Sequence, residues 1–218
     1  MIPIPLRTTE RLSATAVVTI ALIVVNTCVF LFTTGDIDQV ASQWGVVPDR
    51  LQIGTLFTSM FLHGGWLHLI FNMLYLWVFG RNVEDLIGPA RFLLFYILCG
   101  LIAAVVHVIF NAHSVIPTIG ASGAIAGVMG AFLVRFPRAK IITLAWIFFF
   151  VTTLEIPAPL LLIVWFAVQF FSGFGSLTEN NYTGGGTAYF AHIGGFLAGM
   201  LLIRLFPPRQ RFRAWYEE

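Results

Sequence analysis

The 218-residue chain is too apolar to form a water-soluble domain, because 58% of its residues are hydrophobic, 10% are charged and its mean hydropathy is +0.89. Soluble domains carry charges on about a quarter of their residues, so the composition predicts an integral membrane protein. The net charge of +2 does not indicate nucleic-acid binding, and Cys28 and Cys99 lie in apolar runs where we expect free thiols.

Six apolar segments are predicted to be membrane-spanning helices, since about 20 apolar residues cross the hydrocarbon layer. In chain order they are 13–34, 66–80, 92–110, 118–135, 157–172 and 188–205. A seventh apolar run, 141–154, is short, rich in β-branched and aromatic residues, and flanked by Lys140 and Glu155.

The basic residues decide between six spans and seven, because loops on the cytoplasmic side accumulate Lys and Arg. With six spans and a cytoplasmic N-terminus, only Arg50 lies outside, and the seventh span would move the last four arginines outside as well. The residues then inside are Arg7, Arg11, Arg81, Arg91, Arg135, Arg138, Lys140, Arg204, Arg209, Arg211 and Arg213. We therefore predict an all-α, six-helix membrane bundle in one domain over 1–218, with both termini cytoplasmic. Residues 141–154 are predicted to be an interfacial or re-entrant connection.

Three of the predicted helices carry polar residues at one depth. His68, Ser122 and His192 each lie twelve or thirteen residues before the arginine that ends the helix, which is about 18–20 Å at 1.5 Å per residue. Asn72 shares the face of His68 at i+4. Polar groups inside a span usually face the protein interior or a cavity. Hydrogen bonding between helices is the alternative explanation for any one of them, but four in one layer favour a functional site.

Small residues flank this layer on two of the helices. Such residues let helix backbones approach closely in membranes, which would bring an imidazole within reach of a serine hydroxyl. The small residues are Gly123 and Gly127 after Ser122, and Gly195 and Gly199 after His192.

A serine hydroxyl becomes a useful nucleophile when a neighbouring histidine accepts its proton. The acids Glu84, Asp85 and Glu155 are predicted at or beyond the cytoplasmic edge, so no carboxylate is expected to orient the histidine. We therefore predict a Ser122–His192 dyad that performs acyl transfer, with a peptide bond as the acyl substrate inside a membrane. His68 and Asn72 could donate hydrogen bonds to the oxyanion of the tetrahedral intermediate.

Other kinds of site are less well supported. GASGA lacks the second glycine of a G-x-S-x-G elbow. His63 and His68 could ligate a metal, but no HExxH motif occurs, and His107 is expected to be solvated. A transporter would need a polar path through both halves of the bilayer, whereas the residues below Asn72 are apolar. We expect no cofactor and no metal.

Five motifs in this order resemble the rhomboid family of intramembrane serine proteases, in its basic six-helix bacterial form. The resemblance covers about residues 45–206. The motifs are FLHGGWLH at 61–68, HLIFN at 68–72, GRNVEDLIG at 80–88, GASG at 120–123 and AHIGGFLAG at 191–199.

The resemblance implies specific roles for residues of this chain. Ser122 would be the nucleophile and His192 the general base, with His68 and Asn72 as oxyanion-hole donors. The resemblance further implies a substrate gate and a cap over the active site: the gate residues would be Phe71, Phe170 and Phe171, and the cap would be the loop 173–188.

The chain departs from the family pattern at one position that bears on the proposed general base, His192. Some family members carry an aromatic residue four positions after the nucleophile, where this chain has Ala126. We therefore expect closer helix packing or a neighbouring side chain to position His192.

The implied activity is hydrolysis of peptide bonds in or near transmembrane segments of membrane-protein substrates. The enzyme would lie in the cell's inner membrane, with the active site open to the extracytoplasmic side. The alternative is a catalytically weak or inactive rhomboid-like protein that binds transmembrane clients.

Overall fold

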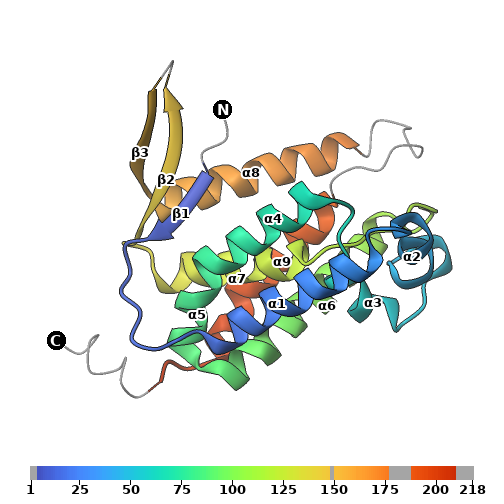
Figure 1. The fold of residues 1–218 in the computed structure, drawn as a ribbon, viewed down its shortest axis with the longest axis horizontal. Helices are drawn as coiled ribbons and strands as arrows, with labels where there is room; N and C mark the ends of the chain where they lie inside the picture. Colours follow the sequence, from blue (N-terminus) through green and yellow to red (C-terminus); the bar gives the residue numbers. More distant parts are fainter. Residues whose placement is uncertain (1–3, 148–149, 177–187, 210–218) are drawn as a thin grey trace.

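The structure, a computed structural model, describes residues 4–147, 150–176 and 188–209. It is mostly helical, with apolar helices side by side and three strands gathered at one end of α8 (Figure 1). The helices are α1 (Val17–Thr33), α2 (Ile37–Trp44), α3 (Thr55–Thr58), α4 (Trp66–Tyr75), α5 (Arg81–Ile87), α6 (Pro89–Phe110), α7 (Ser122–Arg135), α8 (Ala158–Ser176) and α9 (Tyr189–Leu202). The strands are β1 (Ile4–Thr8), β2 (Lys140–Ile147) and β3 (Phe150–Pro157). Short 3-10 turns occupy Pro48–Arg50, Ser59–Phe61 and Ile203–Leu205, and a π-helical turn at Leu76–Gly80 joins α4 to α5.

The helices have the composition of membrane-spanning segments. Among the described residues, α6 and α8 are long and apolar enough to cross a bilayer alone, and α1 with α2 would be a third span, bent by 119°. The helices α7 and α9 are apolar but shorter. This architecture is consistent with a multi-pass membrane protein; the count of six spans and the side on which the termini lie stay predictions.

The first helix begins four residues later than predicted, and both its first turn and the segment before it form hydrogen bonds to α5. The carboxylate of Glu84 accepts hydrogen bonds from the backbone N–H of Val18 (2.9 Å) and from the N–H and hydroxyl of Thr19 (2.7 and 2.8 Å). Asp85 accepts from the N–H and hydroxyl of Ser13. Both carboxylates are buried, and Glu84 satisfies the orphan N–H groups at the start of a helix that has no side-chain cap of its own.

The prediction of an all-α fold is wrong in one region. Of residues 141–154, predicted to be interfacial or re-entrant, 141–147 and 150–154 belong to the antiparallel pair β2–β3, and β1 joins the other edge of β2. Dense β-branched and aromatic residues favour a pleated strand over a helix. The apolar character of this run is therefore explained by strand pairing in a sheet.

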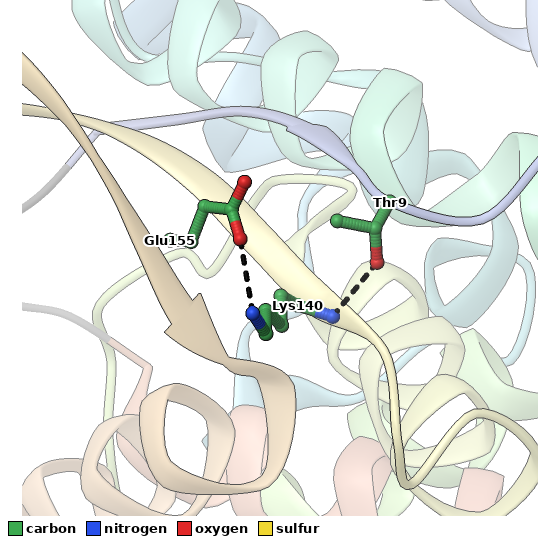
Figure 2. A network of polar contacts seen from close by, with 3 residues as sticks. All are labelled: Thr9, Lys140 and Glu155. Atoms are coloured by element: carbon green, nitrogen blue, oxygen red, sulfur yellow. Dashed lines mark hydrogen bonds and ion pairs between the residues drawn. The ribbon is translucent and has the colours of Figure 1, made fainter.

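The sheet ties the N-terminal strand to the start of α8. Figure 2 shows its polar contacts: Lys140 Nζ pairs with Glu155 at 3.1 Å, and the Lys140 backbone N–H donates to the Thr9 hydroxyl at 3.0 Å. The first residue of α8 is also hydrogen-bonded to the segment just before β2, since the N–H of Ala158 donates to the carbonyl of Ala139 at 2.9 Å. The sheet therefore anchors one end of α8.

The centre of the molecule is α7. Its ten consecutive residues from Gly123 to Phe132 are all buried, and α9, α6 and the α4–α5 segment pack around it. By contrast, only four of the nineteen residues of α8 are buried. The candidate site lies where α4, α7, α8 and α9 meet.

Candidate active site

Ser122 is the first residue of α7. The backbone of Gly120, two residues earlier, has φ of +130°, a conformation that residues with a Cβ rarely adopt. The N–H groups in the first turn of a helix have no intrahelical acceptor. The Ser122 hydroxyl and the backbone N–H groups of the first turn therefore lie together at the start of α7.

The expected close approach of α7 and α9 is confirmed at the level of the backbone. A Cβ added to Gly195 or Gly199 would meet the carbonyl oxygen of Gly123 or Gly127, and one added to Gly130 would meet a carbonyl of α9. Only glycine fits at these positions, since the obstacle is backbone rather than a flexible side chain.

This packing brings His192 to Ser122. The Nε2 atom of His192 lies 2.8 Å from the Ser122 hydroxyl oxygen, and the imidazole is buried. The two residues are 70 positions apart in the chain and come from different helices. The distance is within the range expected for a nucleophile and its general base.

A third residue contacts the other nitrogen of His192. The side-chain oxygen Oε1 of Gln169, on α8, lies 2.7 Å from His192 Nδ1. The ring of Trp165, one turn earlier on α8, packs beside the imidazole with 5.8 Å between ring centroids. The prediction of a two-residue site was incomplete: among the described residues no carboxylate contacts His192, but an amide and an indole from α8 do. They form the neighbouring support expected where Ala126 replaces an aromatic residue.

Sequence reasoning missed Gln169 and Trp165, although one signal was present. In the predicted span 157–172, Gln169 is the only amide and no residue is charged. An amide in hydrocarbon needs a partner. That isolated polarity could have marked the residue as one that faces the interior.

His68 lies on the other side of the nucleophile. Its Nδ1 accepts a hydrogen bond from the Gly64 backbone N–H at 3.3 Å, which leaves Nε2 as the nitrogen that carries the proton. A Cβ on Gly120 would lie 2.7 Å from His68 Nε2 and 3.7 Å from the Ser122 hydroxyl. The absence of a side chain at Gly120 therefore lets a histidine N–H donor lie close to the serine.

Asn72, one turn after His68 on α4, is buried. In the part of the chain that the structure describes, its Nδ2 has no hydrogen-bond partner. It is therefore an unused donor within the helix that carries His68.

A cavity of about 30 Å³ adjoins the nucleophile. Its lining includes Ser122, Gly120, Thr118 and His107. The expectation that His107 is solvated is wrong: the residue is buried, and its Nε2 lies 2.8 Å from the Thr118 hydroxyl. A cavity of this volume has room beside the serine for little more than one small group.

The three predicted gate residues are not brought together. Phe71 on α4 and Phe170 and Phe171 on α8 are all exposed. Phe170 packs against Phe171 and Phe174, but no ring contact between described residues joins them to Phe71. Most of the predicted cap, 173–188, lies outside the described residues, since only 173–176 and 188 are described. The gate and the cap stay predictions.

The described residues include no group of three or more His, Cys, Asp or Glu side chains placed to hold a metal ion. His63, which together with His68 was a possible metal ligand from the sequence, is buried. Its ring packs against that of His68, with 5.0 Å between the ring centroids.

The comparisons with known proteins agree with the motifs. The profile of the Rhomboid domain family matches residues 50–209. The chain is 44% identical to Rhomboid protease GluP of Bacillus subtilis (strain 168) over 78 residues, which are 36% of this chain and 15% of that protein. It is 30% identical to RHOMBOID-like protein 1 of Arabidopsis thaliana over 167 residues, 77% of this chain and 38% of the relative. It is also 30% identical to Inactive RHOMBOID-like protein 8 of Arabidopsis thaliana over 155 residues, 71% and 38% of the two chains. The chain spans less than half the length of each of these relatives.

Proposed function

Because the chain belongs to the rhomboid family, we propose that it is a serine-type intramembrane endopeptidase that hydrolyses peptide bonds in or near transmembrane segments of membrane-protein substrates. The observation that carries this proposal is the 2.8 Å contact between the Ser122 hydroxyl and His192 Nε2 in a buried site. The family includes both proteases and members named inactive, so membership alone does not establish activity.

The chemistry follows from the contacts. His192 Nε2 accepts the proton of the Ser122 hydroxyl as the oxygen attacks the substrate carbonyl, which gives a tetrahedral intermediate with a negatively charged oxygen. The protonated His192 then donates that proton to the leaving amine, and the C–N bond breaks to leave an ester on Ser122. Water, deprotonated by His192, attacks the ester and releases the carboxylic acid, and the serine recovers its proton.

The negative oxygen needs donors fixed in advance. We assign this role to the Nε2–H of His68, the Nδ2–H of Asn72 and the backbone N–H of Ser122. His68 Nε2 lies beside Gly120, Asn72 Nδ2 is otherwise unused in the described chain, and the Ser122 N–H is a first-turn donor. Two of these three donors come from α4, so the position of α4 relative to α7 matters for catalysis.

The setting of the site is part of the proposal. We place six spans in the cell's inner membrane, both termini in the cytoplasm, and the site open to the extracytoplasmic side, as the distribution of basic residues indicates. Transmembrane substrates would enter between α4 and α8, past the exposed rings of Phe71, Phe170 and Phe171. No cofactor or metal takes part in the mechanism.

The test is cleavage of a fluorogenic transmembrane peptide in proteoliposomes. We expect Ser122→Ala and His192→Ala each to lower kcat by at least about a thousandfold, because nucleophile and base act as a unit. The matched controls are Ser42→Ala and His113→Ala, which alter exposed residues outside the site.

Labelling with a fluorophosphonate distinguishes an active serine protease from a protein that binds transmembrane clients without cleaving them. A reactive serine in the wild type that is lost in Ser122→Ala supports the protease. A wild-type protein that neither cleaves a varied panel of transmembrane peptides nor reacts with the probe would overturn the proposal in favour of binding transmembrane clients without cleavage.

A further inference from the structure

The contact between Gln169 and His192 Nδ1 is not needed to explain a two-residue site. We propose that Gln169 is a positioning residue, which holds the neutral imidazole of His192 in the tautomer with its proton on Nδ1 and its lone pair directed at Ser122. This inference rests on the function proposed above.

The hydrogen-bonding roles of the atoms carry the argument. The Gln169 atom that faces Nδ1 at 2.7 Å is the carbonyl oxygen Oε1, which can only accept. Nδ1 must therefore carry the proton. A neutral imidazole has a single N–H, so Nε2, 2.8 Å from the Ser122 oxygen, is left as the acceptor. The Gln169 contact on one side of the ring thus decides which nitrogen can act as a base on the other.

Burial makes this preference costly to reverse. Gln169 is 8% exposed and His192 9% exposed. With the amide oriented as it is here, the other tautomer would place Nδ1 and Oε1, two acceptors, face to face without a proton between them. A buried polar atom without a partner is far more costly than one in water. The site therefore favours the tautomer that general-base catalysis requires.

Trp165 restricts the ring in a second way. It lies four residues before Gln169 on α8, so both side chains are on the same helix face. Its indole packs beside the imidazole, while Val164 and Val168, one position before each of them, are more than half exposed. One face of α8 therefore supports the base through a hydrogen bond and a ring contact.

An amide differs from the carboxylate of a three-residue serine protease site. A carboxylate orients the imidazole and also stabilises the positive charge that forms on it. The amide oxygen of Gln169 has no net charge, so its contribution is mainly to orient the neutral base. Loss of this contact should therefore lower kcat less than loss of His192 itself.

The first measurement is the tautomer in the wild type, read by ¹⁵N NMR of histidine-labelled protein in detergent micelles. The His192 signals are identified from their absence in His192→Ala. We expect a protonated Nδ1 and an unprotonated Nε2. The opposite pattern, with the proton on Nε2, overturns the proposal without any variant of Gln169.

The variants test the cause. Gln169→Met keeps the length of the side chain and removes the acceptor. We expect the second tautomer to appear and kcat to fall about tenfold, as loss of one neutral hydrogen bond predicts, with KM changed less than about twofold. Gln169→Glu keeps an acceptor and should retain the tautomer. The control Val168→Ala, on the exposed face next to Gln169, should leave tautomer, kcat and KM unchanged.

The failures of the two proposals are distinguishable. An unchanged tautomer and kcat in folded Gln169→Met overturns the role of Gln169 and leaves the protease intact. Undiminished cleavage in Ser122→Ala or His192→Ala overturns the protease, while the NMR measurement still reports on the contact between Gln169 and His192.

Discussion

The helix α9 has two neighbours that contact it in different ways. Against α7 it packs at backbone level, and glycines on both helices leave no room for a Cβ. Against α8 it packs through aromatic rings, with Phe166 stacked on Phe196 at 4.9 Å and Trp165 beside both Phe196 and His192. The first contact fixes the distance between two helix axes, whereas the second depends on side chains that can rotate.

This difference separates two requirements of the proposed chemistry. The glycine contact sets how far His192 lies from Ser122. The contact with α8, the helix of which only four residues are buried, sets which nitrogen of the imidazole carries the proton. Distance is thus determined where two helix backbones are in contact, and orientation is determined by the helix with more exposed residues.

The largest effect should come from a methyl group in the glycine contact. In Gly199→Ala the new Cβ would meet the carbonyl oxygen of Gly127. Backbone must move, so we expect the free energy of unfolding to fall by about 3 kcal/mol, at the upper end for overpacking. Cleavage should be lost as His192 shifts. Thermal unfolding in detergent and the peptide assay measure the two effects.

The control for this change is Gly35→Ala, because a Cβ there would meet no atom within 4 Å. Equal stability of the Gly199→Ala and Gly35→Ala proteins would show that α7 and α9 can separate at little cost, and the contrast between the two interfaces would fail.

A smaller effect is expected on the α8 side. Trp165→Leu removes the ring beside His192 and Phe196. A single aromatic contact contributes about 1 kcal/mol, so stability should fall by about that amount. We expect kcat to fall several-fold, because the imidazole gains freedom to rotate while Gln169 still holds Nδ1.

The conservative change Trp165→Phe should recover most of the activity, and Val164→Ala, on the exposed face of α8, should have no effect on kcat. A loss of stability as large as that of Gly199→Ala would mean that α8 is as rigidly packed as α7.

The smallest effect should come from the sheet. Lys140 and Glu155 pair at 3.1 Å, but their side chains are 54% and 56% exposed. Exposed ion pairs contribute little, so we expect Lys140→Met to change the free energy of unfolding by at most about 0.5 kcal/mol. Cleavage should be unchanged. A clear loss of activity would instead connect the sheet, through the start of α8, to the position of Gln169.

The sequence was most informative where a polar residue in an apolar helix had few possible hydrogen-bond partners. Isolated Ser and His in apolar helices, together with small residues at helical spacing, predicted the α7–α9 contact. The sheet was missed because periodicity and hydropathy do not separate a short apolar strand from a membrane-dipping segment. Trp165 was missed because the rotation of α8 about its axis is set by packing against α9, and an aromatic residue in an apolar helix does not indicate which face turns inward. Gln169, the one amide of the predicted span 157–172, indicated an inward position, but nothing in the sequence identified His192 as its partner.

The bonds at the start of α1 have a consequence for how the protein is made. The N–H groups of Val18 and Thr19 find their acceptor in Glu84, more than sixty residues later in the chain, and β1 pairs with a strand that begins at Lys140. The N-terminal segment therefore leaves the ribosome well before its partners exist. The first turn of α1 can therefore gain these bonds only after α5 has been synthesised, and β1 can pair only after β2 has been synthesised.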